Sequence, residues 1–328
     1  MKSRVALEGV HGCSTPLSFR EHAASSEAQE AGAKEGLRAA LQRCGPYERV
    51  TLAYLGVSNL LLLVFHKDLP GAGEYVFLHC AIGAGILALV WAAERWPSTG
   101  LHFMRHWYPF ALFIYFFEEL HHIVHLIFPE WFDRWLIAFD FALFGAHPTV
   151  WMEQFAAPAL NDLMAFFYLT YYFFTVVLAG ALYSRKEWRP FWMVMTATAA
   201  AYAMGYLIAL AFPIEGPYHT LRALQAGPLD GGSVTALMSF IQRFGRVHGA
   251  AFPSLHVAGA FVALLGARKF LRGLFLVFLP LFAAMCVSTV YGRYHYVADI
   301  FGGLVVGAAG FWIAQKWEVR REKVVKEA

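Results

Sequence analysis

The sequence predicts an all-α fold, a polytopic bundle of about eight helices embedded in a membrane. The first observation is composition: 59% of the 328 residues are hydrophobic and 15% are charged, against about 25% charged residues in an ordinary soluble domain. A soluble chain of this size buries about three quarters of its surface and could not hide so much apolar area. This composition excludes nucleic-acid-binding modules, secreted disulfide scaffolds and cytosolic enzymes. The other two observations are a series of long apolar segments and an uneven distribution of Lys and Arg.

The first 45 residues differ from the rest of the chain. They are rich in Ala, Glu, Ser and Gly, carry scattered charges and contain no long apolar run. A chain of this composition cannot bury enough apolar surface to fold, and the apolar core of a signal peptide is missing. We therefore expect residues 1–45 to be a disordered cytoplasmic tail.

Eight apolar segments of about the length that crosses a bilayer follow this tail. The first three belong to residues 46–158, together with an interfacial segment at about 129–158. That segment mixes tryptophans with charges, which is typical of helices that lie on a membrane surface. The last five spans belong to residues 159–315, and residues 316–328 form a basic cytoplasmic tail. The predicted spans are 50–66, 75–93, 107–128, 161–183, 191–212, 254–268, 274–290 and 297–315.

The distribution of Lys and Arg indicates how these spans are oriented. With the N-terminus in the cytoplasm, the inner segments hold 20 of the 26 Lys and Arg residues, and the outer segments hold 6. Cytoplasmic loops of membrane proteins carry such an excess, and one span more or fewer would scramble it. We therefore expect an integral membrane protein with both termini in the cytoplasm. The long loop at 213–253 then lies on the outer face, which is periplasmic or lumenal.

Two segments on this outer face carry ionisable residues suited to catalysis. His295 and Asp299 lie four residues apart at the start of the eighth span, so they share one helix face, and the carboxylate can hold the imidazole in one tautomer. His256 begins the sixth span on the same side of the membrane. Two imidazoles, one of them oriented by a carboxylate, supply a nucleophile and a general acid. Arg246 and Arg293 on this face carry the charge that a phosphate group requires.

The residues around these histidines resemble a known family. The chain reads Phe-Pro-Ser-Leu-His at 252–256 and Ser-Thr-x5-His-x3-Asp at 288–299. These segments resemble the second and third signatures of the type 2 phosphatidic acid phosphatase superfamily of membrane phosphoesterases, which read Pro-Ser-Gly-His and Ser-Arg-x5-His-x3-Asp. Leu255 replaces the usual Gly and Thr289 replaces the phosphate-binding Arg. The first signature of the family, a Lys followed by Arg-Pro, is not found upstream.

The resemblance implies a fold and a mechanism. It implies a bundle with a six-helix phosphatase-like core, in which residues 159–315 are the catalytic membrane region. His295 would attack phosphorus to form a phosphohistidine-type intermediate, and Asp299 would support it. His256 would protonate the leaving oxygen and later deprotonate the acceptor. Because imidazole chemistry on phosphorus can proceed without a metal, we expect no cofactor.

The substrates implied are phospholipids or sphingolipid-like lipids within the bilayer, with no nucleic-acid partner. The departures at Leu255 and Thr289 resemble the branch that contains the inositol phosphorylceramide synthases, which transfer a phospho-head group to a lipid alcohol. A phosphatase that hydrolyses phosphatidate-like or polyprenyl phosphates is the alternative, because both reactions use the same three residues. With no charge at position 289, Arg293 and Arg246 are the candidates for binding phosphate. Ser254 and the backbone amides at the start of the sixth span could also hold phosphate oxygens.

A second cluster of ionisable residues lies in the third span. Glu118, His121, His122 and His125 recur at spacings of three, four and seven, close to one helix face. Such a set could bind a divalent metal, and the protein would then be a metal-dependent lipid oxidase. An oxidase would need further histidine boxes, and none is present, so we expect a polar stripe rather than a metal site. A transporter is a further alternative, but it would place charges at mid-membrane rather than at the span ends.

Five aromatic or histidine residues near the outer face are expected to have structural roles. In the fourth span, Tyr168, Tyr171 and Tyr172 are expected to pack against other helices. In the long outer loop, Tyr218 and His219 are expected to anchor the loop, although they could line the site.

Overall fold

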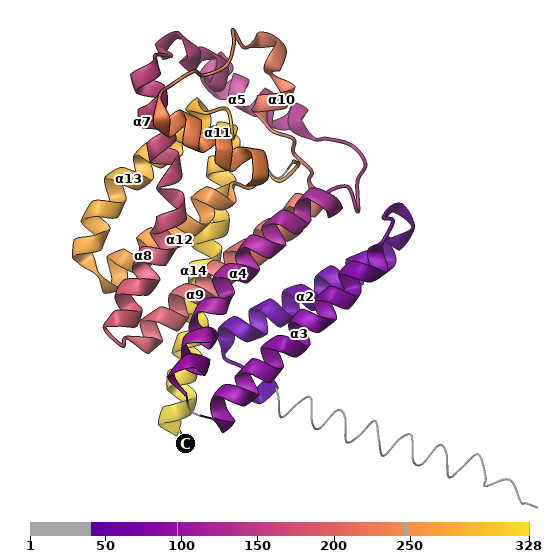
Figure 1. The fold of residues 1–328 in the computed structure, drawn as a ribbon, viewed down its shortest axis with the longest axis vertical. Helices are drawn as coiled ribbons and strands as arrows, with labels where there is room; N and C mark the ends of the chain where they lie inside the picture. Colours follow the sequence, from indigo (N-terminus) through magenta and orange to yellow (C-terminus); the bar gives the residue numbers. More distant parts are fainter. Residues whose placement is uncertain (1–40, 97, 246–247, 328) are drawn as a thin grey trace, which may run out of the picture. The chain divides into compact units, whose positions relative to one another are not determined.

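The computed structural model describes residues 41–96, 98–245 and 248–327. The chain divides into two units, Met1–Arg43 and Cys44–Ala328, and the second contains all of the helices named below. The disordered tail predicted for residues 1–45 falls almost entirely outside the described residues. The described helices, labelled as in Figure 1, are α2 (Pro46–Val64), η1 (His66–Asp68), α3 (Ala72–Arg95), α4 (Thr99–Ile123), α5 (Asp133–Phe144), α6 (Pro148–Trp151), η2 (Met152–Phe155), α7 (Pro158–Leu169), α8 (Tyr171–Ser184), α9 (Trp188–Ala211), α10 (Pro217–Thr220), η3 (Arg222–Leu224), α11 (Ser233–Gly245), α12 (Leu255–Phe270), α13 (Arg272–Tyr291) and α14 (Val297–Glu327).

Among the described residues, five helical segments are long and apolar enough to cross a membrane. Each coincides with one of the predicted spans. The other three predicted spans correspond to α2, α4 and α12, which are helical but do not meet the same criteria; α12, for example, has only 16 residues. The protein is thus an all-α membrane helical bundle, while the count of eight spans stays a prediction. The five segments are Ala72–Arg95, Pro158–Ser184, Trp188–Ala211, Arg272–Tyr291 and Val297–Glu318.

Large apolar side chains on the outer faces of these helices support the membrane assignment. Phe77 of α3, Ile114 of α4 and Val305 of α14 are 75%, 67% and 69% exposed. Side chains of this kind, spread over many helices, would form extended apolar patches in water, but in a bilayer they contact lipid tails. The helices therefore bury one face against each other and present another to lipid.

Helix α9 occupies the centre of the bundle. It contacts α2, α4, α8, α12 and α14. Within its most apolar stretch of 18 residues, 72% of the residues are buried. Small residues permit this close packing: a Cβ added at Gly310 of α14 would lie 2.5 Å from the carbonyl oxygen of Ala197 in α9. Small side chains let helix backbones approach closely in membranes, where lipid tails remove the hydrophobic drive for association. The other two long helices pack on this inner set: α3 contacts α2 and α4, and α13 contacts α8 and α12.

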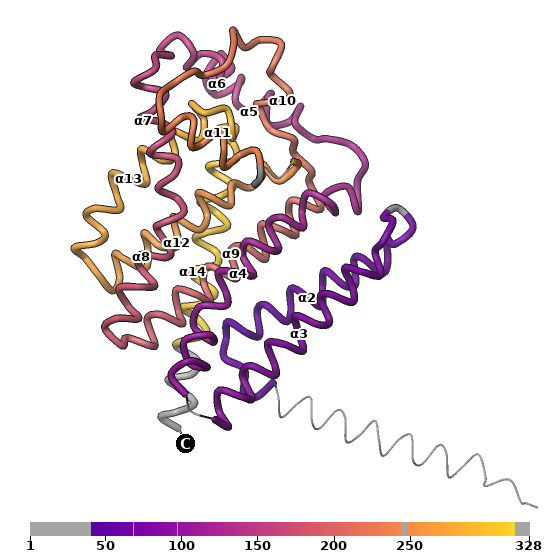
Figure 2. Tube along the Cα trace, in the orientation of Figure 1, coloured from indigo at the N-terminus to yellow at the C-terminus, as the bar shows by residue number. Residues whose placement is uncertain are grey.

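The short helices gather at one end of the bundle. The tube in Figure 2 shows α5, α6, α10 and α11 at the end where α13 finishes and α14 begins. Asp140 of α5 fixes the start of α14, because its two carboxylate oxygens accept the backbone N–H groups of Val297 (2.9 Å) and Ala298 (3.0 Å). Burial raises the pKa of this carboxyl above its usual value. The first turn of a helix has free N–H groups that such an acidic group satisfies.

Asp133, at the start of α5, joins two further segments at this end. Its carboxylate accepts the backbone N–H groups of Glu215 (2.9 Å) and Gly216 (2.8 Å), which follow α9. It also accepts the hydroxyl of Tyr296, next to His295, at 2.9 Å. Burial raises the pKa of Tyr296, so its hydroxyl stays protonated and can donate. The interfacial segment thus holds in place the turns on which the predicted site residues lie.

Candidate active site

The structure brings His256, His295 and Asp299 together at this end of the bundle. His256 lies in the first turn of α12, His295 lies in the turn between α13 and α14, and Asp299 lies in the first turn of α14. His256 Nδ1 is 3.0 Å from His295 Nε2, and His295 Nδ1 is 3.1 Å from Asp299 Oδ2. His295 and Asp299 are buried, at 3% and 0% exposure. Three residues that are distant in sequence therefore form one continuous chain of hydrogen-bonding groups.

The starts of α12 and α14 are tied together by backbone contacts. Ser254 N–H donates to the carbonyl oxygen of Asp299 at 3.1 Å. The side chain of Ser254 caps α12 by accepting the N–H of Val257, at 3.4 Å. Gly303, one turn after Asp299, makes this approach possible, because a Cβ there would lie 2.5 Å from the carbonyl oxygen of Ser254. Ser254, a candidate for phosphate binding, is thus fully buried and serves as a helix cap in this structure.

Tyr168 extends the chain of hydrogen-bonding groups beyond His256. Its hydroxyl oxygen is 3.1 Å from His256 Nε2. One proton arrangement satisfies every contact: Tyr168 O–H donates to His256 Nε2, His256 Nδ1–H donates to His295 Nε2, and His295 Nδ1–H donates to Asp299. This arrangement leaves the lone pair of His295 on Nε2. From sequence, only helix packing was expected for Tyr168. Its contact with His256 depends on how α7 and α12 are placed relative to each other, which the sequence pattern does not specify.

Asp299 is itself held in place beside the ring of His295. Its Oδ2 atom also accepts the backbone N–H of Tyr296 at 2.8 Å. Its Oδ1 atom is buried and has no hydrogen-bond partner among the described residues. A carboxylate held by the backbone of the same turn cannot rotate away from the imidazole. The pair is therefore preorganised to hold His295 in one tautomer and to stabilise a cationic ring.

Arg293 is the one Arg or Lys among the described residues that line the space beside His256 and His295. It adopts a left-handed backbone conformation with φ of 64°, and its side chain is buried. Its Nη2 atom pairs with Glu153 Oε1 at 2.8 Å, and its Nη1 atom donates to the carbonyl oxygen of Gly227 at 2.7 Å. Its Nε atom has no partner among the described residues. The guanidinium is thus positioned at the site but partly neutralised by Glu153. Arg246 lies outside the described residues.

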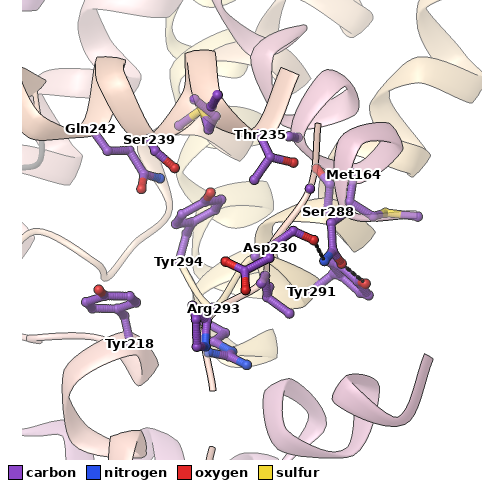
Figure 3. Close-up of a pocket in the computed structure, with 18 of the residues that line it drawn as sticks. Met164, Tyr218, Asp230, Thr235, Ser239, Gln242, Ser288, Tyr291, Arg293 and Tyr294 are labelled. Carbon is purple, nitrogen blue, oxygen red and sulfur yellow. Dashed lines mark hydrogen bonds between the residues drawn. The ribbon is translucent and has the colours of Figure 1, made fainter. Parts of the chain in front are cut away.

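Two adjoining cavities open onto these residues. A small space of about 80 Å³ contacts both histidines. A second cavity, of about 790 Å³, lies between α7, α11 and the end of α13. Figure 3 shows Tyr218, Arg293 and Tyr294 in this larger cavity, with Ser239 and Gln242 of α11 near them. Tyr218, Gln242, Arg293 and Tyr294 line both spaces, so the two cavities adjoin at these side chains.

The histidines at the end of the third predicted span, His121, His122 and His125, do not reach His256 or His295 in the described contacts. The rings of His121 and His122 are exposed and stack edge to face, with centroids 5.1 Å apart, and His125 packs on Trp131. His121 Nδ1 accepts the backbone N–H of His248 at 3.3 Å. This cluster therefore lies at the rim of the bundle.

Comparison with known proteins agrees with this geometry. A family model of the PAP2 superfamily matches residues 134–313, which is more than half of the chain and includes His256, His295 and Asp299. No curated protein and no solved structure matched the chain in the same comparisons. The matched region begins within α5 and runs to α14, so it contains the segments that carry Tyr168, His256, His295 and Asp299. The chain belongs to the PAP2 superfamily, the membrane phosphoesterases that its two histidine motifs resemble.

Proposed function

We propose that the chain is a lipid phosphotransferase that acts through a phosphohistidine on His295 and passes a phospho-head group to a lipid alcohol. The observation that carries this proposal is the continuous chain Tyr168–His256–His295–Asp299, of which the first three residues line the small cavity beside the larger one. A neutral imidazole that attacks a phosphoester needs one fixed tautomer and a partner for the positive charge that it acquires. Asp299 meets both needs. His256, which comes from another helix, is free to serve the leaving group.

The first half of the reaction begins when a phosphoester enters between the two rings. The 3.0 Å contact between His256 and His295 leaves no room for phosphorus, so the rings separate as the substrate binds. His295 Nε2 then forms a bond to phosphorus while the bond from phosphorus to the leaving oxygen breaks. His256 takes up a proton as the phosphoester binds, so that its Nε2–H donates to the Tyr168 oxygen. The imidazolium then gives its Nδ1 proton to the leaving oxygen and is left as a neutral ring. Asp299 stabilises the imidazolium character that develops on His295.

The second half returns the protein to its starting state. An acceptor hydroxyl loses its proton to His256 and attacks phosphorus, and the bond from phosphorus to His295 breaks. Water as acceptor gives a phosphatase, and an alcohol gives a transferase. Two features support the alcohol: the 790 Å³ cavity beside the site has hydroxyl, amide and guanidinium groups on its walls, and Leu255 and Thr289 depart from the phosphatase signatures in the manner of the inositol phosphorylceramide synthases.

Arg293 is our candidate for stabilising charge on the phosphate. It lines both cavities, and its buried Nε atom has no partner among the described residues. Arg222 and Arg243 line the larger cavity and can attract an anionic head group. Arg246 stays a candidate from sequence alone. The charge of Arg293 is available to substrate only in part, because Glu153 already pairs with it.

A product assay tests this proposal. Purified protein is given a phospholipid labelled in its phosphate, with and without a long-chain alcohol, and both released phosphate and new phospholipid are followed. We expect label in a new lipid when the alcohol is present. Release of phosphate alone, unaffected by the alcohol, would favour the phosphatase. No turnover of any lipid phosphoester, while the protein remains folded, would contradict both forms of the proposal.

We further propose that the site faces the outer side of the membrane and that both termini are cytoplasmic, because of the distribution of Lys and Arg. Single cysteines at positions 230 and 187, each in a cysteine-free background, report the two sides. An impermeant thiol reagent should modify Asp230→Cys in intact cells and spare Glu187→Cys. The reverse pattern would place the chemistry in the cytoplasm.

A further inference from the structure

A second group of ionisable side chains lies beside the catalytic histidines and takes no part in the proposed reaction. One potential ligand atom from each of Glu215, His219 and His248 lies within 4.8 Å of the other two. Glu215 Oε1 and His248 Nε2 are 2.8 Å apart, and the rings of His219 and His248 have centroids 4.8 Å apart. In the part of the chain that the structure describes, this is the one group of three or more His, Cys, Asp or Glu residues close enough to share a metal ion.

The backbone around Glu215 and His248 brings these side chains together. Segments on either side of the long loop pair in parallel, since Ala251 N–H donates to the carbonyl oxygen of Ile214 at 3.2 Å. Asp133 holds the following peptide by accepting the N–H groups of Glu215 and Gly216. Metal sites are tight when the backbone that carries the ligands is fixed before the ion binds.

The third ligand is placed by the turn that follows Glu215. Gly216 has φ of 102°, a conformation that favours glycine, and it begins the short helix α10. His219 lies in that helix, four residues after Glu215, and its side chain is exposed. A solvent-exposed third ligand leaves a path by which an ion can enter.

The donor set indicates the class of ion. Two imidazole nitrogens and one carboxylate oxygen are the protein ligands of many Zn²⁺ sites. Such sites have three protein ligands and keep the fourth position for water or substrate. His219 adds a third donor atom within 4.8 Å of the atoms of Glu215 and His248. Ligand atoms this close need to move by only about 1 Å to reach Zn²⁺–ligand distances near 2.0 Å.

We propose that Glu215, His219 and His248 bind a divalent transition-metal ion of the Zn²⁺ class. The ion links the end of α9 to the loop that leads into α12 and hence to His256. Glu215 and His219 also line the small space that contains His256 and His295, so the ion lies at the wall of that space. This site replaces the third-span cluster of His121, His122 and His125 as the metal candidate. It does not depend on the reaction proposed above.

Direct binding measurements test the site. The full-length protein is purified in detergent without a polyhistidine tag, stripped with a chelator and titrated with Zn²⁺ against a competing chelator. We expect one tightly bound equivalent and a Zn²⁺-dependent rise in melting temperature, because an ion that binds only the folded protein stabilises it. Titration with Co²⁺ should give visible absorption bands typical of a four-coordinate site.

Single substitutions identify the ligands. Glu215→Gln, His219→Ala and His248→Ala should each weaken Zn²⁺ binding by on the order of 100-fold or more, since even residues that only support a ligand contribute 10–100-fold. His122→Ala, an exposed histidine on the same rim, is the matched control and should bind Zn²⁺ as the wild type does.

If His248→Ala fails to fold, His219→Ala decides the question, because His219 is exposed. A wild-type protein that binds no Zn²⁺ more tightly than the His219→Ala variant would overturn the proposal. Equal loss of affinity in His122→Ala would also overturn it, because binding would then be a property of surface histidines in general.

Discussion

The His79–Glu119 pair and the His295–Asp299 pair place the same two chemical groups in two regions of the molecule. His79 of α3 lies 2.8 Å from Glu119 of α4, and both side chains are almost fully buried. His295 and Asp299 lie 3.1 Å apart and are equally buried. Distance and burial therefore do not distinguish a structural pair from the pair that we propose to be catalytic.

The two pairs differ in what surrounds the imidazole. The other ring nitrogen of His79 faces the side-chain oxygen of Asn59 at 2.9 Å, and Tyr115 donates to the same oxygen of Glu119 that His79 contacts. Neither His79 nor Glu119 lines either of the two cavities. The other ring nitrogen of His295 faces a second histidine at the edge of a cavity. A histidine–carboxylate pair becomes a candidate site when its free nitrogen meets a second base and a space for substrate.

The largest expected effect separates the two histidines. His295→Ala should abolish turnover, because it removes the atom that bonds to phosphorus. His79→Ala should leave the specific activity of folded protein nearly unchanged but destabilise it by about 1–3 kcal/mol, the cost of leaving buried hydrogen-bonding groups without their partner. Turnover and thermal unfolding in detergent are measured on both variants. A folded His79→Ala protein that lost activity as His295→Ala does would show that the two pairs do not differ in function.

The carboxylates give the next largest difference. Asp299→Asn keeps the shape of the side chain but removes the charge that supports the His295 ring, so turnover should fall by a factor on the order of 10²–10⁴. Glu119→Gln should change turnover by no more than about twofold, because Glu119 lines neither cavity. The measurement is kcat on one lipid substrate at saturating concentration. Similar losses in the two variants would show that the α2–α4 region acts on the chemistry.

The smallest expected effect concerns the three histidines at the end of the third predicted span. Replacing His121, His122 and His125 together by Asn should lower stability more than specific activity, because their rings lie at the rim and none contacts His295. Activity per folded molecule and the unfolding temperature are compared with the wild type. A loss of about a thousandfold, comparable with that from a catalytic residue, would promote this cluster to the active site.

The contacts that sequence could predict are those that local geometry encodes. His295 and Asp299 are four residues apart, which places them on one helix face in any helix that begins there. Apolar length located all five helices that meet the criteria for a membrane span. His256 could be placed beside His295 only by the resemblance to a family and by orientation, since no local rule brings α12 to α14.

The remaining site contacts depend on how helices dock. Glu153 pairs with Arg293 across 140 positions in the chain, and Asp133 and Asp140 of the interfacial segment cap turns more than 80 residues away. Hydropathy identified that segment only as amphipathic. To predict such pairs, one must know the tilt and register of each helix, and composition and periodicity do not determine them. The same holds for Glu215 and His248, which the pairing of two loop segments brings within hydrogen-bonding distance.

The identity of the phosphorylated residue tests the central claim most directly. In His256→Ala, an ester with a good leaving group such as nitrophenolate needs little protonation, so His295 should still be phosphorylated while transfer to an acceptor is slowed. Rapid quench with a radiolabelled substrate should then trap acid-labile, base-stable label on His295. Label on another residue, or turnover near the wild-type rate in His295→Ala, would contradict the account.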